Sequence, residues 1–371
     1  MPLEIHCPRC GEEYPLDTHE WVCVRCRGHL EIRGTAAFDP ALVDRAQASI
    51  WRYRALLPLP EGAEPVSLGE GWTPLVPVRL GTRAVHAKLD FLMPSGSFKD
   101  RGSSVLASAL RAFGVQRVVE DSSGNAAASL AAYAARAGLE AQIFVPAHTV
   151  SAKVRQTEAY GARLEATEGP RENAADAAQQ AVVQGGAYYA SHYYNPFALA
   201  GMETTAWELW EQLDRRAPDQ IVLPVGNGTN FVGLYRGWCR LRAAGLIDRL
   251  PRLCAAQAAA VAPLALAFAN GASEPAPVEP KRTAAEGIAV SRPVRGAEIL
   301  AAIRETRGTA VAVDEDEIRV AQHNLARQGL LVEPTSATAV AALDNIGELP
   351  GLTVVSLTGS GLKTIYSAYQ E

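Results

Sequence analysis

The stretch Ser95-Gly96-Ser97-Phe98-Lys99-Asp100-Arg101-Gly102 places a lysine after a Gly/Ser turn, at the start of a helical stretch that runs to about residue 113. The chain holds only 5 lysines among its 35 basic residues, so arginine is its usual cation. A desolvated lysine can lose its proton and form a Schiff base, which a guanidinium cannot do. We therefore interpret Lys99 as the amine that holds an aldehyde cofactor as an imine. The alternative, from this stretch alone, is a surface lysine near a helix start.

Apolar, β-branched runs alternate with Ala-rich helical runs from about residue 66 onward. This alternation predicts an α/β protein with parallel sheets covered by helices, whose ligands bind at the carboxyl ends of strands. We also expect a helix over 37–56. The predicted strands are 117–120, 142–146, 163–166, 188–192, 220–225, 252–256, 310–313 and 354–358. The other predicted helices are 102–113, 126–137, 152–160, 171–184, 200–213, 230–244, 315–328 and 335–345.

The composition excludes several classes of protein. The 371 residues are 48% hydrophobic and 20% charged, as in an ordinary soluble globular protein, and suffice for two or three domains. A net charge of −5 indicates no basic surface for nucleic acid or anionic membranes. No apolar run approaches the roughly 20 residues that span a bilayer, and Met1-Pro2-Leu3-Glu4 does not resemble a signal peptide. We therefore expect a cytoplasmic protein without nucleic-acid or membrane partners.

Four of the six cysteines form the pattern Cys7-x2-Cys10-x12-Cys23-x2-Cys26. Two such CxxC pairs can present four thiolates to one tetrahedral ion, and disulfides are not expected in a chain without an export signal. The pattern predicts a structural zinc site with Cys7, Cys10, Cys23 and Cys26 as ligands. Unmetallated CxxC pairs or a thiol redox pair are the alternatives. Four thiolates leave no open coordination position, so we expect no catalytic role for the metal.

Three polar loops each follow a predicted strand. Glu120-Asp121-Ser122-Ser123-Gly124-Asn125 precedes a helix and could bind a substrate carboxylate, or it is a plain Ser/Asn cap. Val225-Gly226-Asn227-Gly228-Thr229-Asn230 lacks both a P-loop lysine and a G-x-G-x-x-G pattern, so a single small phosphate group fits it best. In Ser356-Leu357-Thr358-Gly359-Ser360-Gly361, Thr358 or Ser360 could bond a ring nitrogen, or the loop is a simple turn.

Taken in order, these stretches resemble the pyridoxal-phosphate enzymes of the tryptophan synthase β-subunit fold (fold type II), and most nearly their threonine synthase branch. The likeness spans residues 66–371, and a cysteine ribbon also occurs in parts of that branch. It implies two parallel-sheet α/β domains with the cofactor in the cleft between them, an N-terminal zinc ribbon, and a homodimer. The stretches that carry it are the lysine stretch, Glu70-Gly71-Trp72-Thr73-Pro74-Leu75, Ser123-Gly124-Asn125, residues 226–230, Glu333-Pro334-Thr335-Ser336-Ala337 and Leu357-Thr358-Gly359-Ser360-Gly361-Leu362-Lys363.

The domain division that we expect has four parts. A zinc ribbon covers 1–36, and a helix and linker cover 37–65. A large cofactor-binding domain is made of 66–103 and 196–371, and a small mobile domain covers 104–195.

The resemblance implies a role for each matching residue. Lys99 would hold pyridoxal 5′-phosphate covalently and shuttle the Cα proton, with Phe98 beside the ring. Asn125 would bond the cofactor 3′-oxygen, and Thr358 would face the pyridine nitrogen. The residues that would cradle the phosphate are Gly226, Asn227, Gly228, Thr229 and Asn230. The residues that would contact the amino-acid substrate are Ser122, Ser123, Lys153, Arg155 and Asn195.

Two departures from the threonine synthase pattern leave the reaction open. That pattern has Thr directly after the Asn, and an Asn-Pro-x-Arg whose Arg grips the substrate phosphate. This chain has Ala126 and Asn195-Pro196-Phe197-Ala198 instead. Loss of a charge-assisted clamp weakens binding of a phosphorylated substrate, for which Lys153 or Arg155 could compensate. Residues 285–290 and the Ser-Ser-Gly-Asn loop resemble threonine and serine ammonia-lyases.

We therefore expect a threonine synthase-like enzyme that converts O-phosphohomoserine to threonine and phosphate. One alternative is an ammonia-lyase whose β-elimination gives a keto acid. Others are β-replacement on another O-substituted amino acid and, as a different class, a zinc-ribbon interaction protein on a degenerate fold.

Overall fold

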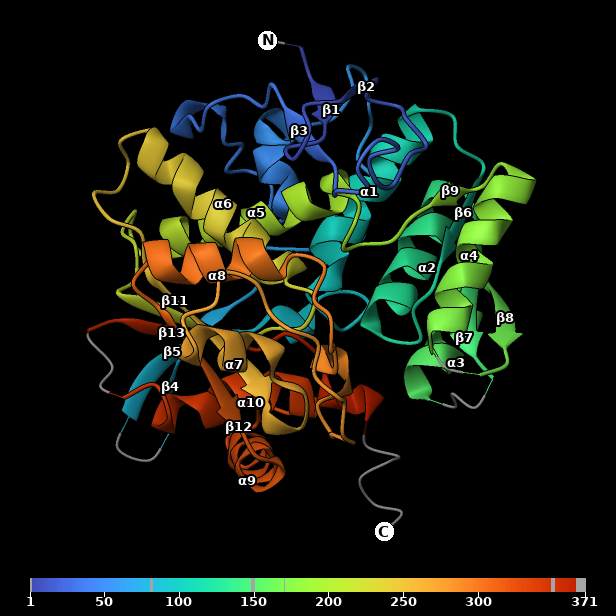
Figure 1. Ribbon diagram of the computed structural model, residues 1–371. Coiled ribbons are helices and arrows are strands. Elements are labelled where there is room, and N and C mark those ends of the chain that lie inside the picture. The colour runs from blue at the N-terminus through green and yellow to red at the C-terminus, as the bar shows by residue number, and fades with distance from the viewer. Residues whose placement is uncertain (1, 81–82, 148–150, 170, 348–350, 365–371) are drawn as a thin grey trace. The chain divides into compact units, whose positions relative to one another are not determined.

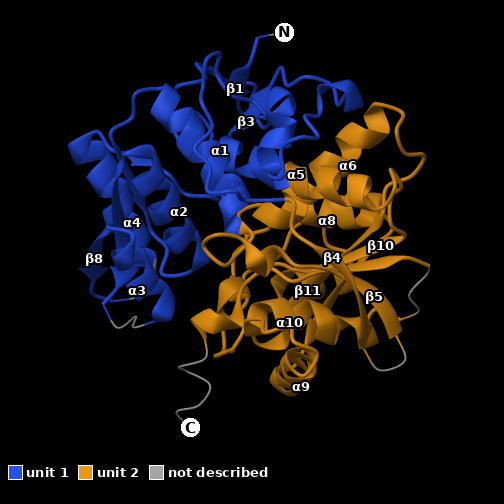
Figure 2. Cartoon of the chain, turned by 180° about the vertical axis from the view of Figure 1, so that it is seen from behind, with its two compact units in different colours: residues 1–71, 99–202 blue, residues 72–98, 203–371 orange. Residues whose placement is uncertain are grey.

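A computed structural model describes residues 2–80, 83–147, 151–169, 171–347 and 351–364. The chain divides into two compact units, unit 1 (1–71 and 99–202) and unit 2 (72–98 and 203–371) (Figure 2). One boundary therefore falls between Phe98 and Lys99, inside the lysine stretch, and another falls within helix α5 (Pro196–Gln212). These units join the ribbon and linker to 99–202. The finer division into four parts stays a prediction.

Unit 1 contains a four-stranded parallel sheet in the order β8-β7-β6-β9. Because crossovers between parallel strands are right-handed, α2 and α3 cover one face of this sheet and α4 covers the other (Figure 1). The strands are β6 (Arg117–Glu120), β7 (Glu140–Pro146), β8 (Arg163–Thr167) and β9 (Tyr188–Tyr189). The helices are α1 (Lys99–Ala112), α2 (Asn125–Ala137), α3 (Ala152–Ala159), α4 (Arg171–Gly185) and the first part of α5.

Unit 2 contains a six-stranded sheet in the order β12-β11-β10-β13-β5-β4, in which only the edge strand β4 is antiparallel. Buried apolar side chains from β10, β11 and β13 meet those of α10 in its core. The strands are β4 (Leu75–Leu80), β5 (Arg83–Lys88), β10 (Gln220–Pro224), β11 (Arg252–Ala258), β12 (Thr309–Val313) and β13 (Thr353–Ser356). The helices are α6 (Thr229–Ala243), α7 (Pro263–Ala269), α8 (Gly296–Glu305), α9 (Glu315–Ala326) and α10 (Pro334–Ala341).

The N-terminal segment of unit 1 is an antiparallel three-stranded ribbon in the order β2-β1-β3, made of β1 (Glu4–His6), β2 (Glu13–Tyr14) and β3 (Glu31–Arg33). The helix predicted over 37–56 is wrong. Two short 3₁₀ helices, Pro40–Leu42 and Ile50–Leu56, begin where Asp39 and Ser49 accept hydrogen bonds from backbone N–H groups. Trp51 and Tyr53 are buried there, so tertiary packing prevails over the Ala-rich composition.

The α/β class with parallel-strand sheets is confirmed. All eight predicted strands are present, with ends shifted by at most three residues. The eight helices predicted within the α/β body are present too, with ends shifted by at most four. The β4–β5 hairpin and helices α7 and α8 were not predicted from the sequence.

Candidate functional site

The loop over 226–230 leads from the carboxyl end of β10 into α6. Gly228 caps α6 with a φ of +89°, and as a glycine it supplies no side-chain bond to the first turn. The first N–H groups of a helix have no intrahelical partner, and together with the helix dipole they favour an anion. A Cβ on Gly226 would lie 3.1 Å from the Ile288 Cα, so the segment 285–290 packs directly on this loop. The loop is therefore a tight, bare-backbone turn that suits a phosphate group.

Two side chains at the start of α6 have unsatisfied polar atoms. Thr229 and Asn230 are 3% and 5% exposed, and neither the Thr229 Oγ1 nor the Asn230 Oδ1 has a hydrogen-bond partner among the described residues. Leaving buried polar groups unpaired costs free energy, and such groups are enriched where a ligand binds. A threonine hydroxyl can donate to a phosphate oxygen. The residues present therefore fit the phosphate of pyridoxal 5′-phosphate.

We expect Gly228→Ala to weaken cofactor binding by about tenfold or more, which corresponds to roughly 1.4 kcal/mol or more. A Cβ at Gly228 would lie 2.2 Å from the Ile299 Cδ1, and the positive φ disfavours a side chain there. Gly245→Ala is the matched control, because its φ is +70° but no atom lies within 4 Å of the added Cβ. Titration of the apoprotein with the cofactor measures both affinities. Equal losses in the two variants would contradict a steric effect on the phosphate loop.

Thr358 lies just beyond β13, which pairs with β10 in the same sheet. It is 1% exposed, and its hydroxyl lies 3.1 Å from the Ser336 Oγ at the start of α10. The Ser336 Oγ also accepts from the backbone N–H groups of Thr358 and Gly359, at 3.0 and 2.8 Å. The Phe98 N–H donates to the Thr358 carbonyl at 2.9 Å. Unit 2 thus brings Phe98 and Thr358 together at the carboxyl edge of the sheet that also carries the 226–230 loop.

Lys99 is the first residue of α1 and is partly buried. The next residue, Asp100, accepts from the Ser129 hydroxyl at 2.6 Å and so ties the start of α1 to the first turns of α2. A Cβ on Gly102 would lie 2.7 Å from the Ala198 carbonyl oxygen, so the glycine permits close contact between α1 and α5. The predicted position of the lysine at a loop-to-helix junction is confirmed. Its covalent role stays a prediction.

The loop over 122–125 follows the carboxyl end of β6 and opens α2. Gly124, not a serine or asparagine, is the N-cap, so the N-cap residue supplies no side-chain bond to the first turn of α2. The interpretation as a plain Ser/Asn cap is therefore wrong. The Ser122 Oγ accepts from the Gly124 N–H at 3.2 Å, which shapes the turn. The N-terminus of α2 is a suitable position for the substrate carboxylate that we predicted near Ser122 and Ser123.

The other predicted substrate residues have different environments. Lys153 is 7% exposed in α3, whereas Arg155 is exposed. Asn195 is buried, donates to the Tyr188 hydroxyl at 2.7 Å and accepts from the N–H groups of Phe197 and Ala198. Asn195 therefore caps α5, and its predicted contact with the substrate stays a prediction.

The four cysteines of the N-terminal pattern gather in the ribbon. Their sulfur atoms all lie within 4.8 Å of one another, and no histidine among the described residues belongs to the group. The Cys7–Cys26 and Cys10–Cys23 sulfur distances are 3.4 and 3.5 Å, far beyond the roughly 2.05 Å of a disulfide. Similar sulfur separations occur around a tetrahedral ion with Zn–S bonds of about 2.3 Å. The donor set therefore fits a zinc ion.

The sulfur of Cys23 lies in an environment that favours the thiolate. Burial alone would raise the pKa of Cys23, but the Tyr14 hydroxyl and the backbone N–H groups of Cys26 and Arg25 donate to its sulfur and lower that pKa to about 6. The Tyr14 oxygen lies 3.2 Å from the sulfur and itself accepts from the Val24 N–H. The thiolate is the form that binds metal.

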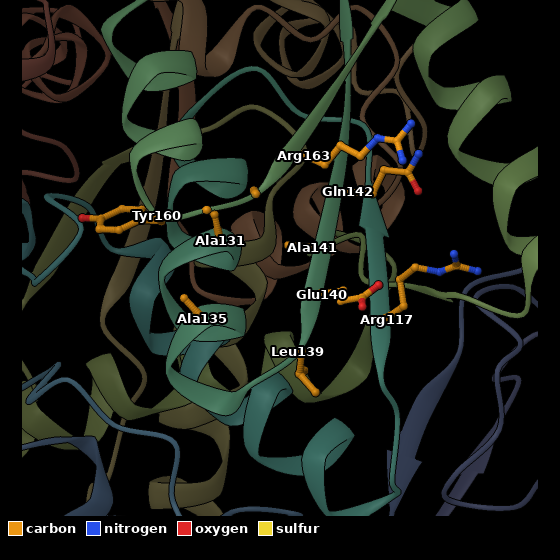
Figure 3. Close-up of a pocket in the computed structure, with 11 residues that line it drawn as sticks. Arg117, Ala131, Ala135, Leu139, Glu140, Ala141, Gln142, Tyr160 and Arg163 are labelled. Atoms are coloured by element: carbon orange, nitrogen blue, oxygen red, sulfur yellow. The ribbon is translucent and has the colours of Figure 1, made fainter.

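A cavity of about 420 Å³ in unit 1 lies at the other end of the sheet. Arg117, Glu140 and Arg163 on its wall are the first residues of β6, β7 and β8, whereas the 122–125 loop follows the carboxyl end of β6. Figure 3 shows Ala131 and Ala135 of α2 on one side, with the arginine side chains on the other side and not converging on them. This cavity is therefore separate from the predicted substrate site.

A family model described as "Pyridoxal-phosphate dependent enzyme" matches residues 66–359. That span includes Lys99, both anion loops and Thr358. The chain belongs to this family. It is thus a pyridoxal-phosphate-dependent enzyme, and the alternative of a non-enzymatic interaction protein is set aside.

Relatives of known function within this family include threonine synthases and a threonine deaminase. The threonine synthase of Methanosarcina acetivorans is 35% identical over 93% of this chain and 87% of its own length. The threonine synthase of Methanocaldococcus jannaschii is 34% identical over 96% and 92%. Among solved structures, a threonine deaminase from T.th. superposes with a TM-score of 0.68 at 27% identity, over 78% of this chain and 92% of that one. The resemblance to the threonine synthase branch is confirmed.

Several residues that shape the site were not predicted from the sequence. Ser336 lies in the stretch 333–337, which carries part of the family resemblance. Nothing in the sequence shows, however, that its hydroxyl would hold the Thr358 loop. Asp121 accepts hydrogen bonds from the hydroxyls of Tyr189 and Tyr193 and so fixes the start of the 122–125 loop. The available signals were the position of Asp121 directly before the serines and the unusual tyrosine pairs at 188–189 and 193–194.

Proposed function

We propose that this enzyme is a threonine synthase, which converts O-phospho-L-homoserine to threonine and phosphate. The observation that carries the proposal is the match to threonine synthases over more than nine-tenths of the chain. Within unit 2 the 226–230 loop suits an anion, and within unit 1 Lys99 opens α1 and the 122–125 loop opens α2.

The residues of the chain divide the chemical work as follows. Bound pyridoxal phosphate supplies an electron sink for negative charge at the carbon next to the substrate amine. Lys99 would hold the cofactor covalently and would move the substrate Cα proton as general base and acid. Thr358 would offer a neutral hydroxyl to the pyridine nitrogen, which would make the ring a weaker electron sink than a carboxylate would. Asn125 bonds the 3′-oxygen, and Ser122 and Ser123 hold the substrate carboxylate.

Ala198 favours a second candidate function. It stands where the threonine synthase pattern has the phosphate-gripping Arg, and it is 1% exposed in α5. Without that arginine, a threonine synthase would need another cation for the leaving phosphate, and Lys153 and Arg155 are the candidates that the sequence offers. A threonine or serine ammonia-lyase needs no such clamp. The packing of 285–290 on the phosphate loop and the likeness to a threonine deaminase support this second candidate.

One experiment separates the two functions. The holoenzyme is incubated with O-phospho-L-homoserine while free phosphate and threonine are measured together. Equal, catalytic rates of both products support the synthase. Absence of both, with an intact cofactor spectrum, rejects it. L-Threonine and L-serine are then assayed for keto acid and ammonia, and other O-substituted amino acids for β-replacement.

We further propose that Cys7, Cys10, Cys23 and Cys26 hold a structural zinc ion. We expect about one zinc per chain by elemental analysis, because four thiolates complete a tetrahedral site. Cys10→Ser should lower that content and the melting temperature, whereas Cys239→Ser, outside the ribbon, should change neither zinc content nor melting temperature appreciably. A full zinc content in Cys10→Ser would contradict this ligand set.

The wider setting of the enzyme is also a proposal. Among the described residues, no helix is long and apolar enough to cross a membrane. The net charge of −5 supports the absence of a nucleic-acid partner. We propose a cytoplasmic homodimer that acts on an amino acid, and light scattering of the holoenzyme tests the dimer.

A further inference from the structure

We propose that the cysteine ribbon positions the loops predicted to bind the substrate, with His19 and Trp21 as its positioning residues. The proposal deepens the proposed function, since it rests on the substrate role of the 122–125 loop. The contacts that carry it all lie within unit 1, and they run from the ribbon through two adjacent tyrosines to two polar loops.

The first contacts are between aromatic rings. The ring of His19 lies edge-on to Tyr188, and the ring of Trp21 lies edge-on to Tyr189, each at 5.4 Å between centroids. Edge-to-face pairs of this kind stabilise beyond the area that they bury. Trp21 also packs on the apolar cluster that contains Val119 of β6. The ribbon segment before Cys23 therefore contacts the sheet through two neighbouring residues.

Tyr188 and Tyr189 make up β9, an edge strand of the four-stranded sheet. Successive side chains of a strand point to opposite faces, so contact with both rings fixes the strand against twisting and sliding. An exposed edge also carries unpaired backbone groups, which proteins often protect with another segment. The ribbon holds an edge that no further strand covers among the described residues.

The hydroxyls of Tyr188 and Tyr189 form hydrogen bonds with two polar loops, and Tyr193 adds a bond to one of them. Tyr189 donates to the Asp121 Oδ1, and Tyr193 donates to the Oδ2 at 3.4 Å. Asp121 immediately precedes the serines of the 122–125 loop. The Tyr188 hydroxyl accepts from the Asn195 amide at 2.7 Å, and Asn195 caps α5. Tyr188 therefore connects His19 of the ribbon to Asn195, and Tyr189 connects Trp21 of the ribbon to Asp121.

Burial keeps these hydroxyls protonated. Tyr188 and Tyr189 are 5% and 1% exposed. Burial raises the pKa of Tyr188 to about 12, with the Asn195 hydrogen bond opposing the shift. Burial and the neighbouring Asp121 raise the pKa of Tyr189 as well. Both contacts therefore persist over the whole working range of an enzyme, so the device is mechanical and not a pH switch.

The test compares hydrogen exchange in the holoenzyme with substrate kinetics. Trp21→Ala should speed amide exchange in peptides that cover 121–125 while leaving 226–230 unchanged. Tyr189→Phe, which removes only the hydroxyl bond to Asp121, should do the same with zinc fully retained. We expect KM for the substrate that is turned over to rise about three- to tenfold, with a smaller change in kcat. A rise of this size corresponds to the free energy that one aromatic pair contributes.

Two matched controls and a double variant make the test specific. Tyr194→Phe removes a neighbouring hydroxyl that bonds neither loop, and Val24→Ala alters an exposed ribbon residue; both should resemble the parent enzyme. The Trp21→Ala/Tyr189→Phe double variant should show less than the sum of the single effects, because both changes interrupt one chain of contacts.

The proposal is overturned if both Trp21→Ala and Tyr189→Phe leave exchange at 121–125 unchanged. It is also overturned if their effects on exchange simply add. The exchange measurement needs no amino-acid substrate, so a failure to turn over O-phospho-L-homoserine would reject the proposed function and leave this test intact. If Trp21→Ala does not fold, the smaller Tyr189→Phe change decides the outcome.

Discussion

We expect Lys99→Ala to abolish measurable turnover and to remove the covalent link that we predict between the cofactor and the chain. The rate should fall by roughly 10³-fold or more, because we predict that the amine serves both as attachment point and as general base. Lys99 opens α1, where the bond between Asp100 and Ser129 fixes its place next to α2. An alanine there leaves the helix start intact, so the phosphate loop in unit 2 should still bind the cofactor non-covalently.

Borohydride fixation followed by peptide mapping measures this directly. The parent enzyme should carry reduced cofactor on the peptide that contains residue 99, and Lys99→Ala should carry none. Lys281→Ala is the control, because Lys281 is exposed and lies in a loop that contains no predicted site residue. Retention of a reduced covalent adduct in Lys99→Ala would show that another lysine holds the cofactor.

Periodic signals made the sheets predictable from the sequence. The strands of both sheets that are buried on two faces appear as short apolar runs between helical runs, and all of them were found. The β4–β5 hairpin was missed because β4 contains Pro77 and the two strands carry Arg79, Arg83 and His86. A proline is tolerated on an edge strand, and β4 is one. The prediction of a helix over 37–56 was wrong because the packing of buried aromatic side chains prevails there over helix propensity.

The candidate site was predictable where chemistry follows topology. In each parallel sheet, the loops that follow the strands lie at the carboxyl edge of that sheet. The polar residues after β6, β10 and β13 could therefore be recognised as site candidates from the sequence. Contacts between segments distant in sequence were not predictable. The bond from Tyr189 to Asp121 and the bonds of Ser336 to the Thr358 loop depend on tertiary packing. Lys88 is the clearest example of a contact that the sequence did not predict. The reasoning applied to Lys99 did not show that another of the five lysines would be buried.

Lys88 forms a buried ion pair under the Trp72 turn of unit 2. Its Nζ donates to the Glu208 Oε2 at 2.9 Å, the Gln212 Oε1 at 2.8 Å and the Thr73 carbonyl at 2.7 Å. Three acceptors match the three N–H donors of an ammonium group. The Glu208 Oε1 accepts from the Trp72 N–H at 2.8 Å, which holds that residue at an unusual φ of +47°. The side chains of Lys88 and Glu208 are 1% and 0% exposed.

We therefore expect Lys88→Met to destabilise the enzyme by about 3–5 kcal/mol, since it removes the ammonium group that pairs with the buried Glu208 carboxylate. For units of this size the melting temperature should fall by roughly 10 °C. Lys281→Met makes the same substitution at an exposed site and should change stability by less than about 0.5 kcal/mol. Thermal unfolding of the three holoenzymes measures the difference. Adding Glu208→Leu to Lys88→Met should recover part of the loss, because it removes the buried carboxylate that Lys88 no longer neutralises, although the Trp72 N–H then loses its bond to Glu208. A melting temperature for Lys88→Met that matches the Lys281→Met control would mean that the pair contributes nothing to stability and that Trp72 is held by its other contacts.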